Sequence, residues 1–352
     1  MLARSRNVRL LGGEIEFTTP VLVPSLSSKA IGPLPRKHGQ AKPEEVACSL
    51  VHSDTLIQGI DDALLVSAYD IKHRLLTDVK SFKRGFQNSR YAQPNLLIID
   101  SGWYEKNVGP RGGQFVFDAG QALSWEEADY VATIDGLDEN VRAVVVGWDF
   151  GGHTYADQIA KARAFFAARP RYASTILLKP PPRALVHKLD RLSDEDAANL
   201  RTFDVVGVTE KDLGDKVLDA LMTLASLREK LDRAEVSAPI HVFGGLDPLY
   251  TPLYFAVGGE IFDGLGWLRY AYMDGMTYHR DSATLLDLAA VGKRWSQAVT
   301  TTWLKNLDEL AQLGDELRMF FHNGGDWTKL RVGPVLEPIY ARFEARGGQA
   351  RV

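Results

Sequence analysis

The chain has 352 residues, of which 41 are Lys or Arg and 45 are Asp or Glu, so its formal net charge is −4. Hydrophobic residues make up 45% and charged residues 24%, which excludes disorder over the whole chain. The single cysteine, Cys48, excludes an intramolecular disulfide and a cysteine-rich zinc site, and it indicates a reducing compartment. The small net charge does not indicate a polyanionic partner, so nucleic-acid binding would depend on local basic patches.

The hydropathy pattern gives no sign of a membrane or export signal. No run of about 18 or more apolar residues occurs, and the first residues turn polar at once. We therefore expect neither a membrane span nor a signal peptide. We also expect a cytoplasmic location.

Short apolar runs recur along the chain, most of them followed by a Gly or polar turn and a helical pattern. The eight runs are Pro20–Leu26, Ala63–Ala68, Asn95–Asp100, Ala143–Asp149, Ser174–Lys179, Phe203–Val208, Pro239–Gly244 and Glu260–Leu265. They are aliphatic and β-branched, as buried parallel strands are. Eight strands alternating with helices over about 250 residues predict an α/β fold, a (β/α)8 TIM barrel. A doubly wound sheet is the alternative.

Other segments are expected around this barrel. Leu10–Thr19 predicts a hairpin with a Gly-Gly turn that could plug the barrel floor. Helices are expected over Trp125–Ile134, with Ser124 and Glu127 as a capping box, and over Asp157–Ala168, Lys216–Leu231 and Thr251–Val257. Ser296–Phe321 predicts one or two long helices, and Asn323–Val352 a turn, a Pro-bracketed segment and a frayed end. We expect residues 1–295 to form the barrel domain and 296–352 a helical extension.

Three predicted strands end in a carboxylate: Asp100, Asp149 and Asp263. Active sites of such barrels lie at the carboxyl ends of the strands. An Asp after a strand is also a common helix cap, which is the structural alternative at each position. Converging carboxylates can provide a nucleophile for an anomeric carbon and a general acid or base, so the pattern favours glycosyl transfer through a sugar–Asp intermediate.

The segment Lys72–Tyr91 combines basic and aromatic side chains. It contains six Lys or Arg residues and one Asp, with Phe82 and Phe86 available for stacking. We expect phosphate contacts from Lys72, Arg74, Lys83 and Arg84, the alternative being a solvated helix face. Gly109–Gln114 is either a lid or a surface loop. The histidines show no metal-ligand spacing, and neither a P-loop nor a dinucleotide fingerprint occurs, so no metal or cofactor is expected.

The ordered motifs resemble one family, the tRNA-guanine transglycosylases (queuine and archaeosine tRNA-ribosyltransferases). GEIEFTTPVLVPSLSS is similar to the family's opening hairpin and first strand, and ALLVSAYDI to its second strand, with Ser67 where Asn is usual. IIDSGWY resembles the Asp-Ser-Gly-Gly-aromatic signature, and GWDFGG the strand end that reads the base. HVFGGLDPLYTPLYFAVGGEIFDGLGWLRYA resembles the segment that carries the nucleophile, and this is the most specific match.

The resemblance implies a role for each matching residue. Asp263 would attack C1′ of the target nucleoside and expel guanine, with Asp100 as general acid and base. Ser101 and Asp149 would bind the base, and Tyr104 and Phe243 would stack on it. Arg269 would hold a phosphate. Further base contacts would come from Lys179, Gly207, Val208 and Gly244.

The chain also departs from the family. No cysteine follows Cys48, so the family's zinc site is absent and its subdomain must be held by packing. Trp103 replaces the second Gly of the signature and must fill space or stack. Lys179 stands where a base-reading Gln is usual, and Val208 stands where the second Gly of a Gly-Gly pair is usual.

The resemblance thus implies a glycosyltransferase that exchanges guanine for a 7-deazaguanine-type purine, as in queuosine modification. The polymer is tRNA or DNA, and a purine-releasing glycosylase is a variant of this reading. A non-catalytic nucleic-acid-binding partner subunit on the same barrel is the alternative from a different class. A homodimer or a heteromeric assembly is left open.

Overall fold

A computed structural model describes residues 1–27, 62–73, 93–107, 123–280, 282–283 and 295–347, together with the backbone of the two-residue strands β4 (Pro35–Arg36) and β5 (Gly39–Gln40). Cys48, the predicted lid Gly109–Gln114 and most of the basic segment after His73 lie outside these residues.

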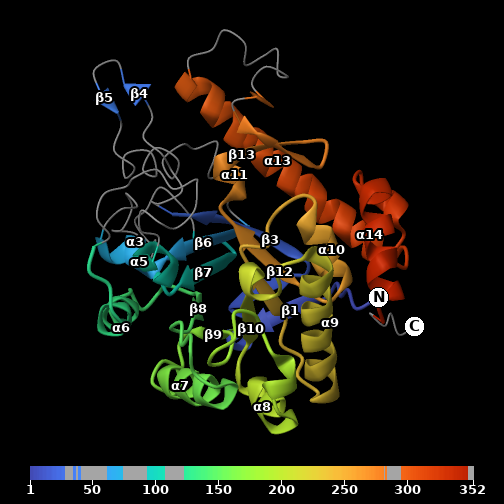
Figure 1. The fold of residues 1–352 in the computed structure, drawn as a ribbon. Helices are drawn as coiled ribbons and strands as arrows, with labels where there is room; N and C mark the ends of the chain where they lie inside the picture. The colour runs from blue at the N-terminus through green and yellow to red at the C-terminus, as the bar shows by residue number, and fades with distance from the viewer. Residues whose placement is uncertain are drawn as a thin grey trace.

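Eight parallel strands form a closed barrel in the middle of the molecule (Figure 1). In chain order they are β3 (Val21–Leu26), β6 (Ala63–Ser67), β7 (Leu96–Asp100), β8 (Val144–Val146), β9 (Ala173–Leu178), β10 (Val205–Thr209), β11 (Ile240–Phe243) and β12 (Ile261–Gly264). Each strand pairs with the next along the chain, and β12 pairs with β3 to close the ring. All eight predicted runs are strands of this barrel, so the predicted TIM-barrel fold is confirmed and the doubly wound sheet is wrong.

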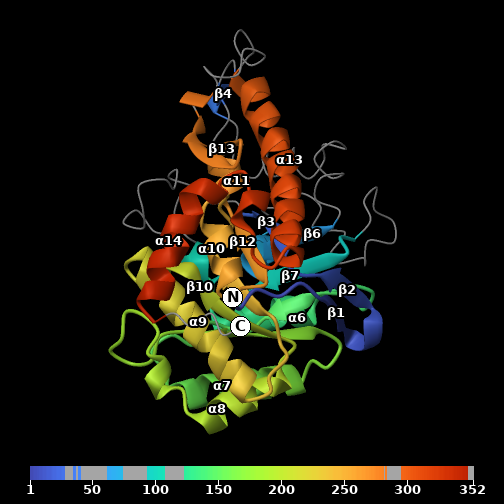
Figure 2. The same cartoon turned by 90° about the vertical axis from the view of Figure 1, so that its right-hand side faces the viewer.

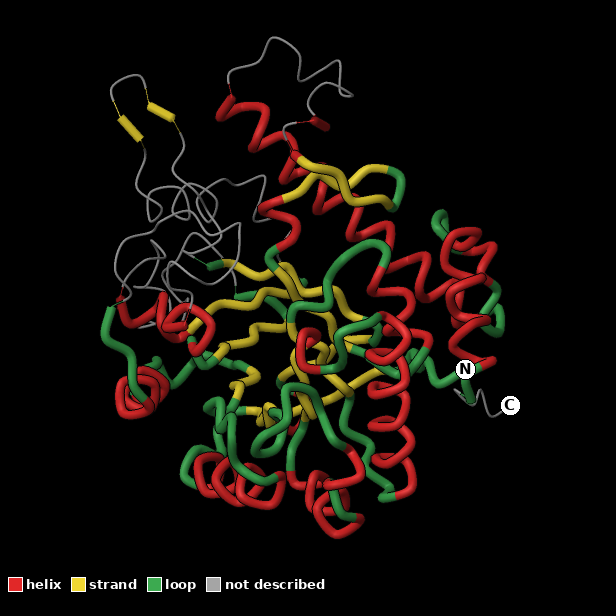
Figure 3. Tube along the Cα trace, in the orientation of Figure 1, coloured by secondary structure: helices red, strands yellow, loops and turns green. Residues whose placement is uncertain are grey.

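Helices and short 3-10 turns surround the ring of strands (Figure 3). The α-helices are α3 (Ala68–His73), α5 (Trp103–Asn107), α6 (Glu127–Asp135), α7 (Tyr155–Ala167), α8 (Asp194–Asn199), α9 (Val217–Arg233), α10 (Tyr250–Ala256), α11 (Gly266–Arg269), α13 (Trp295–His322) and α14 (Gly333–Ala345). Outward-facing strand residues such as Val206 and Val242 share one apolar core with this helical layer. No helix in the described part of the chain is both long and apolar enough to span a membrane.

An N-terminal hairpin closes the floor of the barrel. Strands β1 (Asn7–Leu10) and β2 (Ile15–Thr18) pair antiparallel around a turn that contains Gly12 and Gly13. The buried side chains of Leu10 and Ile15 share a core cluster with inward-facing residues at the amino ends of the strands, such as Ala63. The hairpin therefore plugs the end of the barrel opposite the predicted site, as the sequence indicated.

The start of α6 differs from the prediction in detail. Its capping box is formed by Glu126 and Asp129, not by Ser124 and Glu127, because the helix begins two residues later than the apolar pattern suggests.

The C-terminal region is more helical than predicted. Ser296–Phe321 lies within the single helix α13, and residues 333–345, where a Pro-bracketed segment of the helical extension is predicted, form the helix α14. Pro334 lies in the first turn of α14, where proline is tolerated, while Pro338 lies inside it. The start of the chain lies beside α14, since Met1, Tyr340 and Glu344 line one cavity.

Helix α13 runs beside a second hairpin, formed by β13 (Tyr270–Met273) and β14 (Met276–His279) (Figure 2). The fully buried amide of Asn306 accepts from the Tyr272 N–H at 2.7 Å. The same amide donates to the carbonyl oxygens of Trp267 at 2.6 Å and Tyr270 at 2.8 Å. These bonds, with side-chain packing, join the hairpin to the helix in the region where the resembled family carries zinc.

Candidate active site

Asp263, on β12 at the carboxyl end of the barrel, is held by residues of the two neighbouring strands, β3 and β11, and of the turn after β11. One carboxylate oxygen, Oδ2, accepts a hydrogen bond from Ser25 Oγ at 2.8 Å. The other, Oδ1, accepts from the Gly244 backbone N–H at 3.1 Å and lies 3.0 Å from His241 Nε2. The side chain is buried, but its residue remains 7% exposed. Hydrogen bonds from these donors fix the orientation of the carboxylate, and the remaining exposure leaves it accessible to a ligand in the barrel mouth.

Asp100 ends β7 at the same end of the barrel. Burial raises its pKa to about 6, opposed by a hydrogen bond from the Gly102 N–H and reinforced by the charges of Asp263 and Asp149. The three predicted carboxylates are thus close enough to interact. A carboxyl group that titrates near neutral pH is suited to general acid and base catalysis.

The turn after Asp100 depends on Gly102 and Trp103. Gly102 has φ +80°, and a Cβ there would lie 2.6 Å from Tyr69 Cβ. Trp103 packs edge-to-face on Trp148 with ring centroids 5.5 Å apart, so its ring fills space against another indole and does not stack on it. Ser101 is buried, and its carbonyl accepts from the Trp125 indole at 3.0 Å.

Glu105, on α5, is an acidic residue that the sequence did not single out. It is 3% exposed; its Oε1 accepts from Ser27 Oγ at 2.8 Å, and its Oε2 has no hydrogen-bond partner among the described residues. Burial raises its pKa to about 8, and the charges of Asp70 and Asp100 add to the effect. No local pattern marks such a residue, because its burial depends on how α5 packs against α3 and the residue that follows β3.

Lys179 and Asp149 lie at the ends of β9 and β8. Lys179 Nζ lies 3.6 Å from Asp149 Oδ2, 2.5 Å from Asp212 Oδ2 and 3.1 Å from Thr209 Oγ1. Asp149 also accepts from the Gly151 N–H at 2.9 Å. The ammonium therefore contacts the carboxylate expected to read the base, so a ligand here meets an ion-pair network and not a lone Asp.

Phe243 occupies the barrel interior at the end of β11. Its ring stacks on that of His241 with centroids 3.7 Å apart. A Cβ on Gly207 would lie 2.6 Å from Phe243 Cε2, so the glycine makes room for the ring. Val208 lies in the barrel ladder between Leu178 and Val242, and its side chain faces the outer core.

Two other predicted residues meet across the barrel rim. Arg269 Nη2 donates to the Tyr104 hydroxyl at 2.9 Å, and Tyr104 is 38% exposed. Lys72 lies on α3, where its Nζ is 3.5 Å from Asp129, so one of its neighbours is already an anion. Arg74, Lys83 and Arg84 fall outside the described residues.

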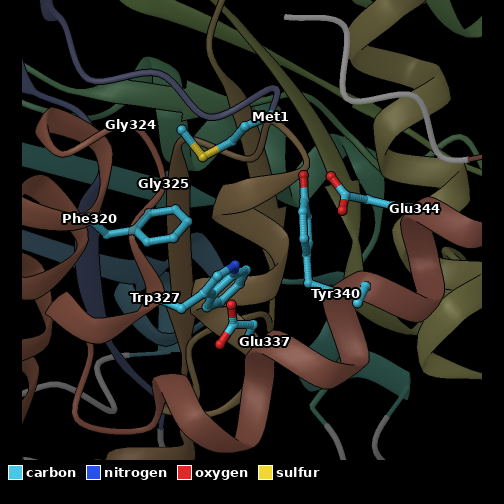
Figure 4. Close-up of a pocket in the computed structure, with 9 residues that line it drawn as sticks. Met1, Phe320, Gly324, Gly325, Trp327, Glu337, Tyr340 and Glu344 are labelled. Carbon is cyan, nitrogen blue, oxygen red and sulfur yellow. The ribbon is translucent and has the colours of Figure 1, made fainter.

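A cavity of about 280 Å³ lies elsewhere, between Met1 and the C-terminal helices (Figure 4). Its wall includes Phe320, Trp327 and Tyr340, and it contains none of the predicted site residues. Among the described residues, no group of three or more His, Cys, Asp and Glu side chains is arranged to hold a metal ion.

Comparison with known proteins shows a partial similarity to one relative. No protein-family profile matches the chain. A stretch of 135 residues is 27% identical to the tRNA-guanine(15) transglycosylase of Thermoplasma volcanium. The matched stretch covers 38% of this chain but only 20% of that relative. Together with the closed parallel barrel, this similarity supports the resemblance to the tRNA-guanine transglycosylase superfamily.

Proposed function

We propose that the protein is a nucleic-acid guanine transglycosylase that exchanges guanine for a 7-deazaguanine-type purine. The observation that carries the proposal is the pairing of two unlike carboxylates at one end of the barrel. Asp263 accepts hydrogen bonds at both oxygens, whereas Asp100 has a pKa raised to about 6 by burial and neighbouring charge. The partial similarity to a tRNA-guanine transglycosylase points to the same chemistry.

The two carboxylates divide the reaction between them. Asp263 attacks C1′ of the target nucleotide as the C1′–N9 bond breaks, and the departing guanine takes a proton from Asp100. The incoming base then attacks C1′, the sugar–Asp bond breaks, and Asp100 takes the proton of that base. The target nucleotide leaves its stack to reach the site. Tyr104 and Arg269, at the rim, contact the bases and phosphates next to the target nucleotide.

Base recognition is the part of the site that departs most from the family. Asp149, with Lys179 beside it, would face the Watson–Crick edge of the purine, and Ser101 lies near by. The ammonium of Lys179 pairs with Asp149 and Asp212. Since an ammonium only donates hydrogen bonds, Lys179 would offer a ligand a donor and no acceptor, whereas Gln offers both. The incoming base would therefore carry an acceptor at that point.

The test is exchange of radiolabelled guanine into tRNA, duplex DNA and single-stranded DNA. We expect label in one polymer, loss of uptake by at least about a thousandfold in Asp263→Asn, and unchanged uptake in the matched control Asp308→Asn, an exposed residue of α13. Uptake that survives in Asp263→Asn would remove Asp263 as the nucleophile.

The same assay separates the alternatives. Guanine release without uptake of any base would indicate a glycosylase that uses water. Polymer binding with neither release nor uptake would indicate a binding subunit and would overturn the proposed enzyme. The polymer that takes up the label decides between tRNA and DNA.

A further inference from the structure

A buried histidine lies directly behind the proposed nucleophile. His241 is fully buried on β11, and its Nε2 is 3.0 Å from Asp263 Oδ1. A carboxylate oxygen only accepts hydrogen bonds, so Nε2 carries the proton in this contact. The other ring nitrogen, Nδ1, is buried and has no hydrogen-bond partner in the part of the chain that the structure describes.

This contact makes the two oxygens of Asp263 unequal. Among the described residues, Oδ1 receives two donors, His241 Nε2 and the Gly244 N–H, whereas Oδ2 receives one, Ser25 Oγ. Hydrogen bonds lower the nucleophilicity of the oxygen that accepts them and hold it in place. Oδ2 is therefore the freer oxygen to attack, and Oδ1 is the oxygen that fixes the orientation of the carboxylate.

The ring of His241 is itself fixed in position. It stacks on Phe243 with centroids 3.7 Å apart and an interplanar angle of 26°. Phe243 in turn fills the space left free by the missing side chain of Gly207. A ring held on one face by an aromatic side chain keeps its donor aimed at one point.

We propose that His241 is a positioning residue that holds Oδ1 of Asp263 so that Oδ2 attacks C1′; this inference rests on the proposed function. The Oδ2–C1′ bond forms as the C1′–N9 bond breaks, the bonding pair leaves with guanine, and Asp100 supplies the proton of the departing base. Oδ1 becomes the carbonyl oxygen of the sugar ester and keeps its two donors. When the incoming base attacks C1′, the ester bond breaks and its electron pair returns to Asp263. The proton of that base passes to Asp100.

The test compares His241→Gln with His241→Met. The two new side chains have nearly the same length and shape, and both lose the ring, but only Gln retains a donor at the ε position. The measurement is the single-turnover rate of the denaturation-stable protein–polymer adduct formed without an incoming base, together with the affinity for the polymer.

We expect His241→Met to slow adduct formation by about tenfold to a hundredfold, with polymer affinity changed less than about threefold. His241→Gln should recover most of the rate at the same melting temperature. Equal rates in the two variants, or no loss in either, would overturn the proposal, because a merely structural ring would not distinguish Gln from Met.

A second measurement needs no active enzyme and no variant of His241. The ¹⁵N signals of the imidazole in the wild-type protein should show the Nε2-protonated tautomer, and Asp263→Ala should abolish that preference. If the wild-type protein forms no adduct with any polymer, the proposed function fails while this signal still tests the contact. A mixed tautomer in the wild-type protein would refute the positioning of Asp263 by His241.

Discussion

Arg269 donates a hydrogen bond to the hydroxyl of Tyr104 over 2.9 Å, although the two residues lie on helices that follow different strands, β12 and β7. The contact brings a cation and an exposed aromatic ring together at the rim, next to the strands that carry Asp263 and Asp100. A phosphate and a base of one polymer could be held at this point.

This pair makes a prediction about salt dependence. Arg269→Gln removes the charge that we propose binds a phosphate, so polymer binding should weaken and the slope of log Kd against log salt should fall by about one. The control Tyr104→Phe removes only the hydroxyl and should leave the slope unchanged. An unaltered slope in Arg269→Gln, measured by titration at several salt concentrations, would show that Arg269 does not contact phosphate.

Asp100 should make the protein less stable as the pH rises. Its pKa in the folded protein is about 6 against an ordinary value of 3.8, raised mainly by burial. The folded state therefore binds more protons than the unfolded state between these two values, and the free energy of unfolding decreases as the pH rises through this window. Asp100→Asn removes the effect and should be more stable than wild type by about 1–3 kcal/mol above pH 6.

Denaturant unfolding at pH 4 and at pH 7.5 measures this difference. The two proteins should be nearly equal in stability at the lower pH. A variant stabilised equally at both values would mean that the gain comes from packing and not from the titration of Asp100.

Glu105 should likewise lower the free energy of unfolding as the pH rises, but over a higher pH range than Asp100. Its pKa is raised from 4.5 to about 8, first by burial and then by Asp70 and Asp100. Stability should therefore fall as the pH rises from about 4.5 to 8. Glu105→Gln keeps an oxygen that can accept from Ser27 Oγ, so it should lose little below pH 5 and exceed wild type at pH 9. Ser27→Ala is the control, since it removes the hydrogen bond but leaves the acid; if Glu105→Gln gave the same stability difference at both pH values, Glu105 would not titrate in this window.

The strands were predictable because each lies in a short, mostly aliphatic and β-branched run of the sequence. Such a run arises when both faces of a strand are buried, inside the barrel and under the helices. This holds for β9 over its whole length and for β7 up to Ile99. The Asp at a strand end was equally visible, since a charge after such a run requires a special environment.

The contacts between strands were not predictable in this way. His241 faces Asp263 only because β11 and β12 are neighbours, with His241 paired to Ile261, two residues before Asp263. Lys179 follows β9, and Asp212 lies in the short 3-10 turn after the neighbouring strand β10, so the two residues meet at adjacent strand ends. Such contacts join residues more than twenty positions apart, and nothing in the local pattern reports them. In α14, Pro338 hid the helix because an internal proline usually ends one.

Asn306 predicts how strongly the C-terminal helix depends on the β13–β14 region. Its buried amide bonds the backbones of Tyr272, Trp267 and Tyr270, so Asn306→Leu leaves one N–H and two carbonyls without that partner. We expect a loss of about 2–4 kcal/mol in the free energy of unfolding. Asn323→Ala removes an exposed amide whose side-chain hydrogen bond, within the described part of the chain, is to the Met319 carbonyl; it should cost less than about 1 kcal/mol. Equal costs in the two variants would show that packing alone holds the hairpin.

Gly207 gives the sharpest test of how the barrel interior is arranged around Asp263. A methyl group there would lie 2.6 Å from the ring of Phe243, so Gly207→Ala must displace that ring, and His241 would lose the surface that fixes it. We expect a loss of about 1–3 kcal/mol in the free energy of unfolding. Gly147→Ala, whose Cβ would meet its nearest neighbour at 3.4 Å, is the control and should be nearly neutral.

A double mutant distinguishes displacement of the ring from strain in the strand. Phe243→Leu shortens the side chain that the new methyl group meets, so Gly207→Ala should cost much less in that background, with a coupling of about 1 kcal/mol or more in the double-mutant cycle. If the costs simply add, the methyl group disturbs β10 itself and not the stack on His241. If they couple, the empty space over Gly207 is what allows Phe243 to support His241, and through it the orientation of Asp263.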